Sequence, residues 1–192
     1  MLLCAAPSAL AARTILVFGD SLSAGYGLRP ENAWPSLLQA RLGEKRLDYS
    51  VANLSISGET TAGGRSRLPD ALRQHRPTIV ILALGANDGL RGLSLDQMKG
   101  NLKEMIRLAS TSKARVLLVG MRLPPNYGPY ADQFTEVFQK LGREDKVPVV
   151  DFLLAGVADQ PALFQADMLH PTAQAQPRLL DNVWSGLAPL LK

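Results

Sequence analysis

Cysteine and histidine are almost absent from the 192-residue sequence, which contains one cysteine and two histidines. A single thiol, Cys4, cannot form an intrachain disulfide or a CxxC pair, so a disulfide scaffold and a thiol-based metal site are excluded. His75 and His170 are too few to form a histidine cluster. The sequence therefore predicts no metal site and no thiol nucleophile.

Long apolar runs and runs of like charge are also missing. No stretch of 18 apolar residues occurs beyond the N-terminal region, so we expect no transmembrane helix. The 21 basic and 17 acidic residues are interspersed, and basic and aromatic residues do not alternate. These features argue against a nucleic-acid partner. The length fits one globular domain with a full core.

The first twelve residues differ in composition from the rest. They are small or apolar, lack Lys and Arg, and contain the small-x-small pattern Ala9-Leu10-Ala11. This pattern is typical of the end of a secretory signal, although the basic region is missing. We therefore predict a leader remnant over 1–12, one folded domain over 13–192, and a periplasmic or secreted protein. The alternative is an N-terminal extension of a cytosolic protein.

Short apolar runs alternate with helix-length segments along the remaining chain. The runs are almost continuous in Val, Ile and Leu, which is typical of parallel strands covered on both faces. The pattern predicts a single-domain, flavodoxin-like, three-layer α/β/α fold with a five-stranded, mainly parallel sheet. The expected strands are 14–18, 48–52, 78–84, 115–120 and 147–152, and the expected helices are 34–42, 61–75, 94–109, 130–144 and 172–191.

A serine and a histidine stand where such a sheet would bring them together. Ser21 follows the first apolar run, and His170 lies three residues after Asp167 near the end of the chain. A serine hydroxyl becomes a useful nucleophile when a histidine takes its proton, and the histidine works best when a carboxylate orients it. These three residues predict a serine hydrolase. His75 ends a polar helix and is assigned a structural role.

Better-known motifs are absent from the first loop. A nucleophile elbow requires Gly-x-Ser-x-Gly, whereas Gly25 comes two positions too late after Ser21. Gly25 and Gly27 lack the third glycine of a dinucleotide fingerprint, and no phosphate-binding loop occurs, so we expect no cofactor. Taken alone, a serine in Gly-Asp-Ser is more often a turn former or a helix cap than a catalytic residue.

Four ordered blocks together resemble the SGNH (GDSL) hydrolase family, in particular its bacterial thioesterase, lysophospholipase and arylesterase group. The resemblance implies that Ser21 is the nucleophile, that Gly58 and Asn87 join the Ser21 N–H in an oxyanion hole, and that His170 and Asp167 complete the relay. Ala86 departs from the family pattern, which usually has glycine there. The blocks are 19–23 (GDSLS), 53–60 (NLSISGET), 84–89 (LGANDG) and 167–171 (DMLHP). Considered singly, Gly58 and Asn87 are also consistent with ordinary turn residues.

The sequence says less about the substrate. Apolar residues in two loops, including Leu90, Leu123 and Pro124, predict an acyl-binding wall, although such residues also serve plain packing. The resemblance implies a small-molecule acyl ester or thioester as substrate. We also expect a monomer with transient contact to lipid surfaces. The alternatives are a carbohydrate O-deacetylase and a non-catalytic flavodoxin-like binding domain.

Overall fold

Five parallel strands form one sheet in the order β2-β1-β3-β4-β5. The computed structural model describes residues 13–191, so the leader predicted over 1–12 lies outside the described residues. The direction of strand order reverses beside β1, which opens a crevice at the carboxyl ends of the strands. The strands are β1 (Arg13–Gly19), β2 (Tyr49–Asn53), β3 (Ile79–Ala83), β4 (Arg115–Val119) and β5 (Val149–Val150).

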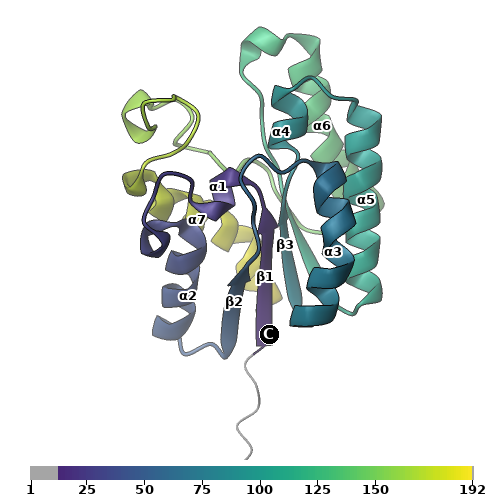
Figure 1. Cartoon of the computed structure of the whole chain (residues 1–192), viewed down its shortest axis with the longest axis vertical. Helices are drawn as coiled ribbons and strands as arrows, with labels where there is room; N and C mark the ends of the chain where they lie inside the picture. Colours follow the sequence, from purple (N-terminus) through teal and green to yellow (C-terminus); the bar gives the residue numbers. More distant parts are fainter. Residues whose placement is uncertain (1–12, 192) are drawn as a thin grey trace, which may run out of the picture.

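Helices cover both faces of the sheet and complete the predicted three layers (Figure 1). Alternate residues of β1 point to opposite faces: Leu16 and Phe18 belong to one buried cluster, and Ile15 and Val17 to the other. The first cluster is covered by α3 (Thr61–His75), α5 (Leu95–Thr111) and α6 (Pro129–Glu144), and the second by α2 (Trp34–Glu44) and α7 (Gln176–Leu187).

The last strand and the last helix are shorter than the sequence predicted. β5 pairs with β4 only through Val149 and Val150, because Pro148 has no N–H and the chain turns away after Val150. The final helical segment is divided by 3-10 turns at Ala173–Ala175 and Ala188–Leu190. Pro189 cannot donate a helical hydrogen bond, which fits the end of α7 at Leu187. The sheet is wholly parallel.

Two short helices replace expected loops at the carboxyl edge of the sheet. They are α1 (Ser21–Ala24), directly after β1, and α4 (Ala86–Leu90), just after β3. Each has too few residues to show a helical period in sequence. Both begin with residues that the sequence analysis singled out, and they place these residues at the crevice.

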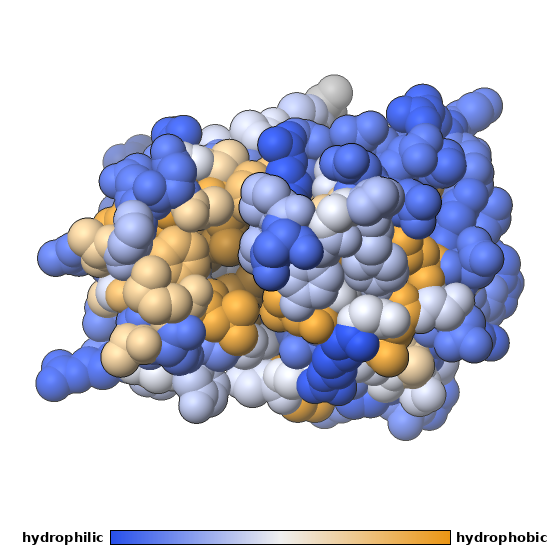
Figure 2. All heavy atoms as spheres, turned by 90° about the horizontal axis from the view of Figure 1, so that it is seen from above, coloured by the Kyte–Doolittle hydropathy of each residue, from blue (hydrophilic) through white to orange (hydrophobic). Residues whose placement is uncertain are grey.

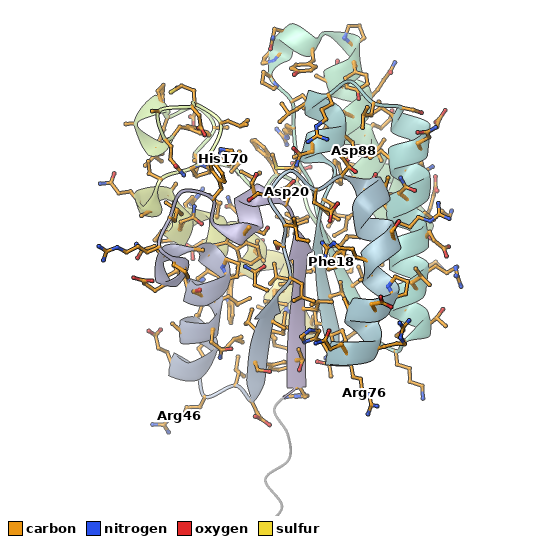
Figure 3. All side chains as sticks on the ribbon, in the orientation of Figure 1. Phe18, Asp20, Arg46, Arg76, Asp88 and His170 are labelled. Atoms are coloured by element: carbon orange, nitrogen blue, oxygen red, sulfur yellow. The ribbon has the colours of Figure 1, made fainter. Side chains whose placement is uncertain are left out.

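Four non-glycine residues with left-handed backbone lie at the opposite, amino edge. Among residues 13–191, five non-glycine residues have positive φ, and four of them lie at the C-cap of a long helix or one residue past it. A left-handed residue often ends a helix, and a cation is favourable there because of the helix dipole. These four are Arg46, Arg76, Lys113 and Lys146, and Figure 3 labels the first two. The fifth, Met168, does not follow a helix.

The described chain starts and finishes at this amino edge. β1 begins there, and α7 runs back from the carboxyl edge to reach it (Figure 1). No helix among the described residues is long and apolar enough to cross a membrane.

Candidate active site

Ser21 stands in the first turn of α1, where the chain leaves β1. The Asp20 carboxylate caps this helix by accepting the Leu22 N–H at 3.0 Å. Position 19, the last residue of β1, must be glycine, because a Cβ at Gly19 would lie 2.9 Å from the Ala83 carbonyl oxygen. This close passage of β1 against β3 fixes the position from which Ser21 faces the crevice.

The structure brings the three predicted relay residues together. Ser21 Oγ lies 2.9 Å from His170 Nε2, and His170 Nδ1 lies 2.7 Å from Asp167 Oδ2. The other Asp167 oxygen accepts the backbone N–H groups of Leu169 and His170 at 2.9 and 3.0 Å. The hydrogen bonds from the backbone and side chain of His170 lower the pKa of Asp167 to about 2, with help from Leu169. The carboxylate is therefore ionised at neutral pH and orients the imidazole.

Sequence reasoning missed two residues that hold the histidine loop against the serine loop. The Gln165 side-chain amide donates to the carbonyl oxygens of Tyr26 and Pro171 at 2.8 and 3.0 Å. Its backbone N–H donates to the His170 carbonyl at 2.8 Å. The Tyr26 ring lies over the imidazole, with a centroid separation of 4.4 Å. No local pattern signals these contacts, because Tyr26 and Gln165 are 139 residues apart.

The predicted oxyanion donors border the same crevice. Gly58 has φ of 79°, which favours glycine, and its carbonyl accepts from Arg91 at 3.1 Å. The Asn87 side-chain amide donates to the Glu59 carbonyl at 3.0 Å, which fixes its orientation. Ala86 lies in the ordinary helical backbone of α4, so its methyl group is accommodated.

A buried network supports the helix that carries Asn87. Asp88 is almost fully buried, and its carboxylate accepts both the backbone N–H and the hydroxyl of Thr61, at 2.9 and 2.6 Å. Asn101 donates to the same hydroxyl at 3.2 Å. These bonds tie α4 to the first turn of α3 and hold Asn87 at the crevice.

Asp20 is the other buried carboxylate at this edge, with a side chain that is 2% exposed. Burial raises its pKa from 3.8 to about 6, while the Leu22 N–H and the charge of His170 act in the opposite direction. Figure 3 shows Asp20 between His170 and Asp88. Since the folded pKa exceeds the unfolded one, the stability contributed by this group is greatest below pH 3.8 and is lost as the pH rises through about 6.

Asp20→Asn is therefore expected to raise the free energy of unfolding by about 1 to 3 kcal/mol at pH 8. The amide oxygen can still accept the Leu22 N–H, and no buried charge remains. The gain should nearly disappear at pH 4, where the wild-type carboxyl is protonated in the folded state. Urea unfolding of both proteins at pH 8 and pH 4 measures the difference in free energy of unfolding. An equal increase at the two pH values would contradict the argument that the buried charge of Asp20 destabilises the fold.

A cavity of about 750 Å³ opens over Ser21 and His170. Figure 2 looks down on the carboxyl edge and shows apolar surface gathered around a hollow. Leu90, Leu123 and Pro124, the residues predicted to bind substrate, all line it. The remaining lining includes Gly58, Asn87 and further apolar side chains, among them Met121, Phe152, Leu154, Pro161, Phe164, Met168 and Leu169.

The charged groups around the cavity have partners within the protein. Arg122 pairs with Asp151, and Arg91 donates to the Gly58 loop. Within residues 13–191, no group of three or more His, Cys, Asp or Glu side chains is arranged to hold a metal ion.

Comparisons with known proteins agree with this geometry. Residues 17–177 match the GDSL-like Lipase/Acylhydrolase family. The chain is 48% identical over 182 residues to Esterase TesA from Pseudomonas aeruginosa, covering 94% of this chain and 90% of that protein. It is 44% identical to an Arylesterase from Vibrio mimicus, covering 94% and 90%, and 41% identical to Thioesterase 1/protease 1/lysophospholipase L1 from Escherichia coli K12, covering 95% and 87%.

The solved structure of TesA has the same fold. It superposes with a TM-score of 0.91 at 48% identity, covering 93% of this chain and 100% of that one. The family predicted from the four sequence blocks is thus confirmed, as is the three-layer fold. The chain belongs to the GDSL-like lipase/acylhydrolase family, and it is an ester-cleaving serine hydrolase.

Proposed function

We propose that this hydrolase cleaves carboxylic esters and acyl thioesters through an acyl-enzyme on Ser21. The observation that carries the proposal is the 2.9 Å contact between Ser21 Oγ and His170 Nε2 at the floor of an apolar cavity. His170 Nε2 takes the hydroxyl proton as Oγ attacks the carbonyl carbon. The imidazolium that forms is stabilised by Asp167, whose carboxylate lies 2.7 Å from Nδ1.

The attack places a negative charge on the former carbonyl oxygen. The backbone N–H groups of Ser21 and Gly58 and the Asn87 amide supply donors for it, which is the electrostatic stabilisation that acyl transfer requires. Collapse of the intermediate breaks the bond to the leaving oxygen or sulfur, and His170 returns the proton to that atom. A water molecule, activated by the same imidazole, then releases the acid and regenerates Ser21.

The acyl chain is proposed to lie along the wall that contains Leu90, Leu123 and Pro124. Their side chains border the cavity, and apolar lining stabilises a buried hydrocarbon chain by about 0.8 kcal/mol per CH₂. This lining supports acyl esters and thioesters over the carbohydrate O-deacetylase alternative, because a sugar would require more polar partners.

A fluorophosphonate probe tests the acyl-serine proposal directly. Intact mass should increase by one probe per folded chain, and peptide mapping should place the label on Ser21. Heat-denatured protein is the control and should remain unlabelled, since the reactivity depends on the assembled relay. Labelling at another residue, or none on folded protein that hydrolyses p-nitrophenyl butyrate, would rule out Ser21 as the nucleophile.

We further propose a periplasmic or secreted monomer that contacts lipid surfaces transiently. The small-x-small pattern within residues 1–12 supports export, and the exposed apolar residues Met168 and Leu169 beside the cavity support lipid contact. One chain supplies the whole relay, which supports a monomer. Periplasmic extraction with N-terminal sequencing tests export. Vesicle flotation tests lipid contact, and light scattering tests the monomeric state.

A further inference from the structure

Met168 has a backbone that its residue type does not favour. Its φ is 56°, in the left-handed region where a side chain is strained and glycine is not. The other four residues of this kind in the described chain cap or follow long helices, where left-handed backbone is a common ending. Met168 instead lies in a turn between Asp167 and His170, within the relay itself.

The relay needs this turn, but it does not need the methionine side chain. The turn aims the N–H groups of Leu169 and His170 at one Asp167 oxygen and brings the imidazole back to the other. Glycine would form the same turn with less strain. The Met168 side chain is 59% exposed and lines the cavity, so the protein core gains little from it. A side chain so placed is available to a molecule that enters the cavity.

Two other exposed apolar side chains line the cavity beside Met168 and His170. Tyr26, which is 52% exposed, lies over the His170 ring, and Leu169, which is 45% exposed, precedes His170. Exposed apolar side chains that gather at one point commonly mark a binding surface.

The chemistry decides which part of a substrate reaches this point. His170 must return its proton to the leaving oxygen or sulfur, so the leaving group has to lie on the His170 side of the reacting carbon. The acyl chain then extends toward the other wall. Leu123 and Pro124 belong to the segment after β4, whereas Met168 belongs to the loop before α7, and residues of both segments line the cavity.

We propose that Met168, together with Tyr26 and Leu169, forms a leaving-group subsite that prefers apolar, ring-bearing alcohols and thiols. The inference rests on the acyl-serine mechanism proposed above. A flexible thioether adapts to rings of different shape and makes favourable contacts with aromatic edges. The Tyr26 ring adds a flat apolar surface next to the imidazole.

The test keeps the acyl group constant and changes only the alcohol. For 2-naphthyl butyrate and methyl butyrate, the ratio of their kcat/KM values is measured in wild type, Met168→Gly and Met168→Asn. Asparagine tolerates left-handed backbone, so the second variant removes the apolar side chain without the extra freedom of glycine. In both variants the naphthyl-to-methyl ratio should fall about tenfold. This factor corresponds to the largest free energy that a thioether–ring contact commonly contributes. Met168→Leu, which keeps an apolar side chain but no sulfur, should retain part of the ratio.

Two control variants separate this subsite from other causes. Lys113→Gly makes the same left-handed-to-glycine change at the amino edge and should leave the ratio unchanged. Leu123→Ala should alter the dependence on acyl-chain length but not on the alcohol. An unchanged ratio in both Met168→Gly and Met168→Asn would overturn the subsite, as would an equal loss on every ester. Failure of the acyl-serine mechanism would appear separately, as a wild-type chain that the phosphonate does not label at Ser21.

Discussion

Ser21→Ala is expected to lower kcat for p-nitrophenyl butyrate by about 10⁴- to 10⁶-fold while the protein stays folded. The variant has no oxygen to form the acyl-enzyme, so only the oxyanion donors and substrate binding remain. Alanine is a good helix former and fits the first turn of α1. Steady-state kinetics combined with thermal unfolding measures both effects, and Tm should change by only a few degrees.

The same short helix provides a matched control. Ser23 is fully buried, and its hydroxyl has no hydrogen-bond partner. Ser23→Ala should therefore leave activity unchanged and be neutral or slightly stabilising. The double variant Ser21→Ala/His170→Ala should be no slower than Ser21→Ala alone, because the two groups act as a unit. A Ser21→Ala variant that keeps a tenth of wild-type activity would contradict the assigned nucleophile.

Asp167→Asn is expected to lower kcat by about 10⁴-fold, the loss that follows when a relay histidine is held in the wrong tautomer. The asparagine oxygen can still accept the N–H groups of Leu169 and His170, so the turn should persist. Its amide nitrogen then faces His170 Nδ1, which must accept a hydrogen bond instead of donating one. The ring proton moves to Nε2, and Nε2 can no longer take the proton of Ser21.

Proton NMR of the imidazole and the pH dependence of kcat/KM test this assignment. The wild-type spectrum should contain an Nδ1–H resonance that disappears in Asp167→Asn. Because the pKa of Asp167 is about 2, this carboxylate stays ionised at neutral and mildly acidic pH, so its own protonation should not shape the pH dependence of kcat/KM in that range. Loss of less than tenfold in the variant would show that the carboxylate does not orient the imidazole.

Local patterns predicted most of the fold and the whole relay. The central strands were found because their residues are apolar without interruption, as a strand covered on both faces requires. Asp167 and His170 were found because both partners lie within one short loop. The strand expected over 147–152 is longer than β5, because the segment is apolar at both ends but pairs with β4 only through Val149 and Val150.

Other features depend on contacts that the linear sequence does not reveal. The Tyr26 ring contacts His170 only after the sheet has brought the two loops together. The Gln165 side chain connects the same two loops through its hydrogen bond to the Tyr26 carbonyl. α4 has five residues, fewer than two helical turns, which is too short for a helical pattern of apolar residues to be recognised in the sequence. The burial of Asp20 follows from how closely α1 packs onto the sheet. Each of these features is set by tertiary structure.

The arrangement of the chain ends has a practical consequence. Arg13 starts β1, and Leu187 ends α7, on the edge of the sheet away from Ser21. A bead, electrode or fusion partner tethered through either end would leave the route to the nucleophile open. Immobilised enzyme should therefore keep the KM of the free protein, whereas a tether attached near the turn before His170 would obstruct it.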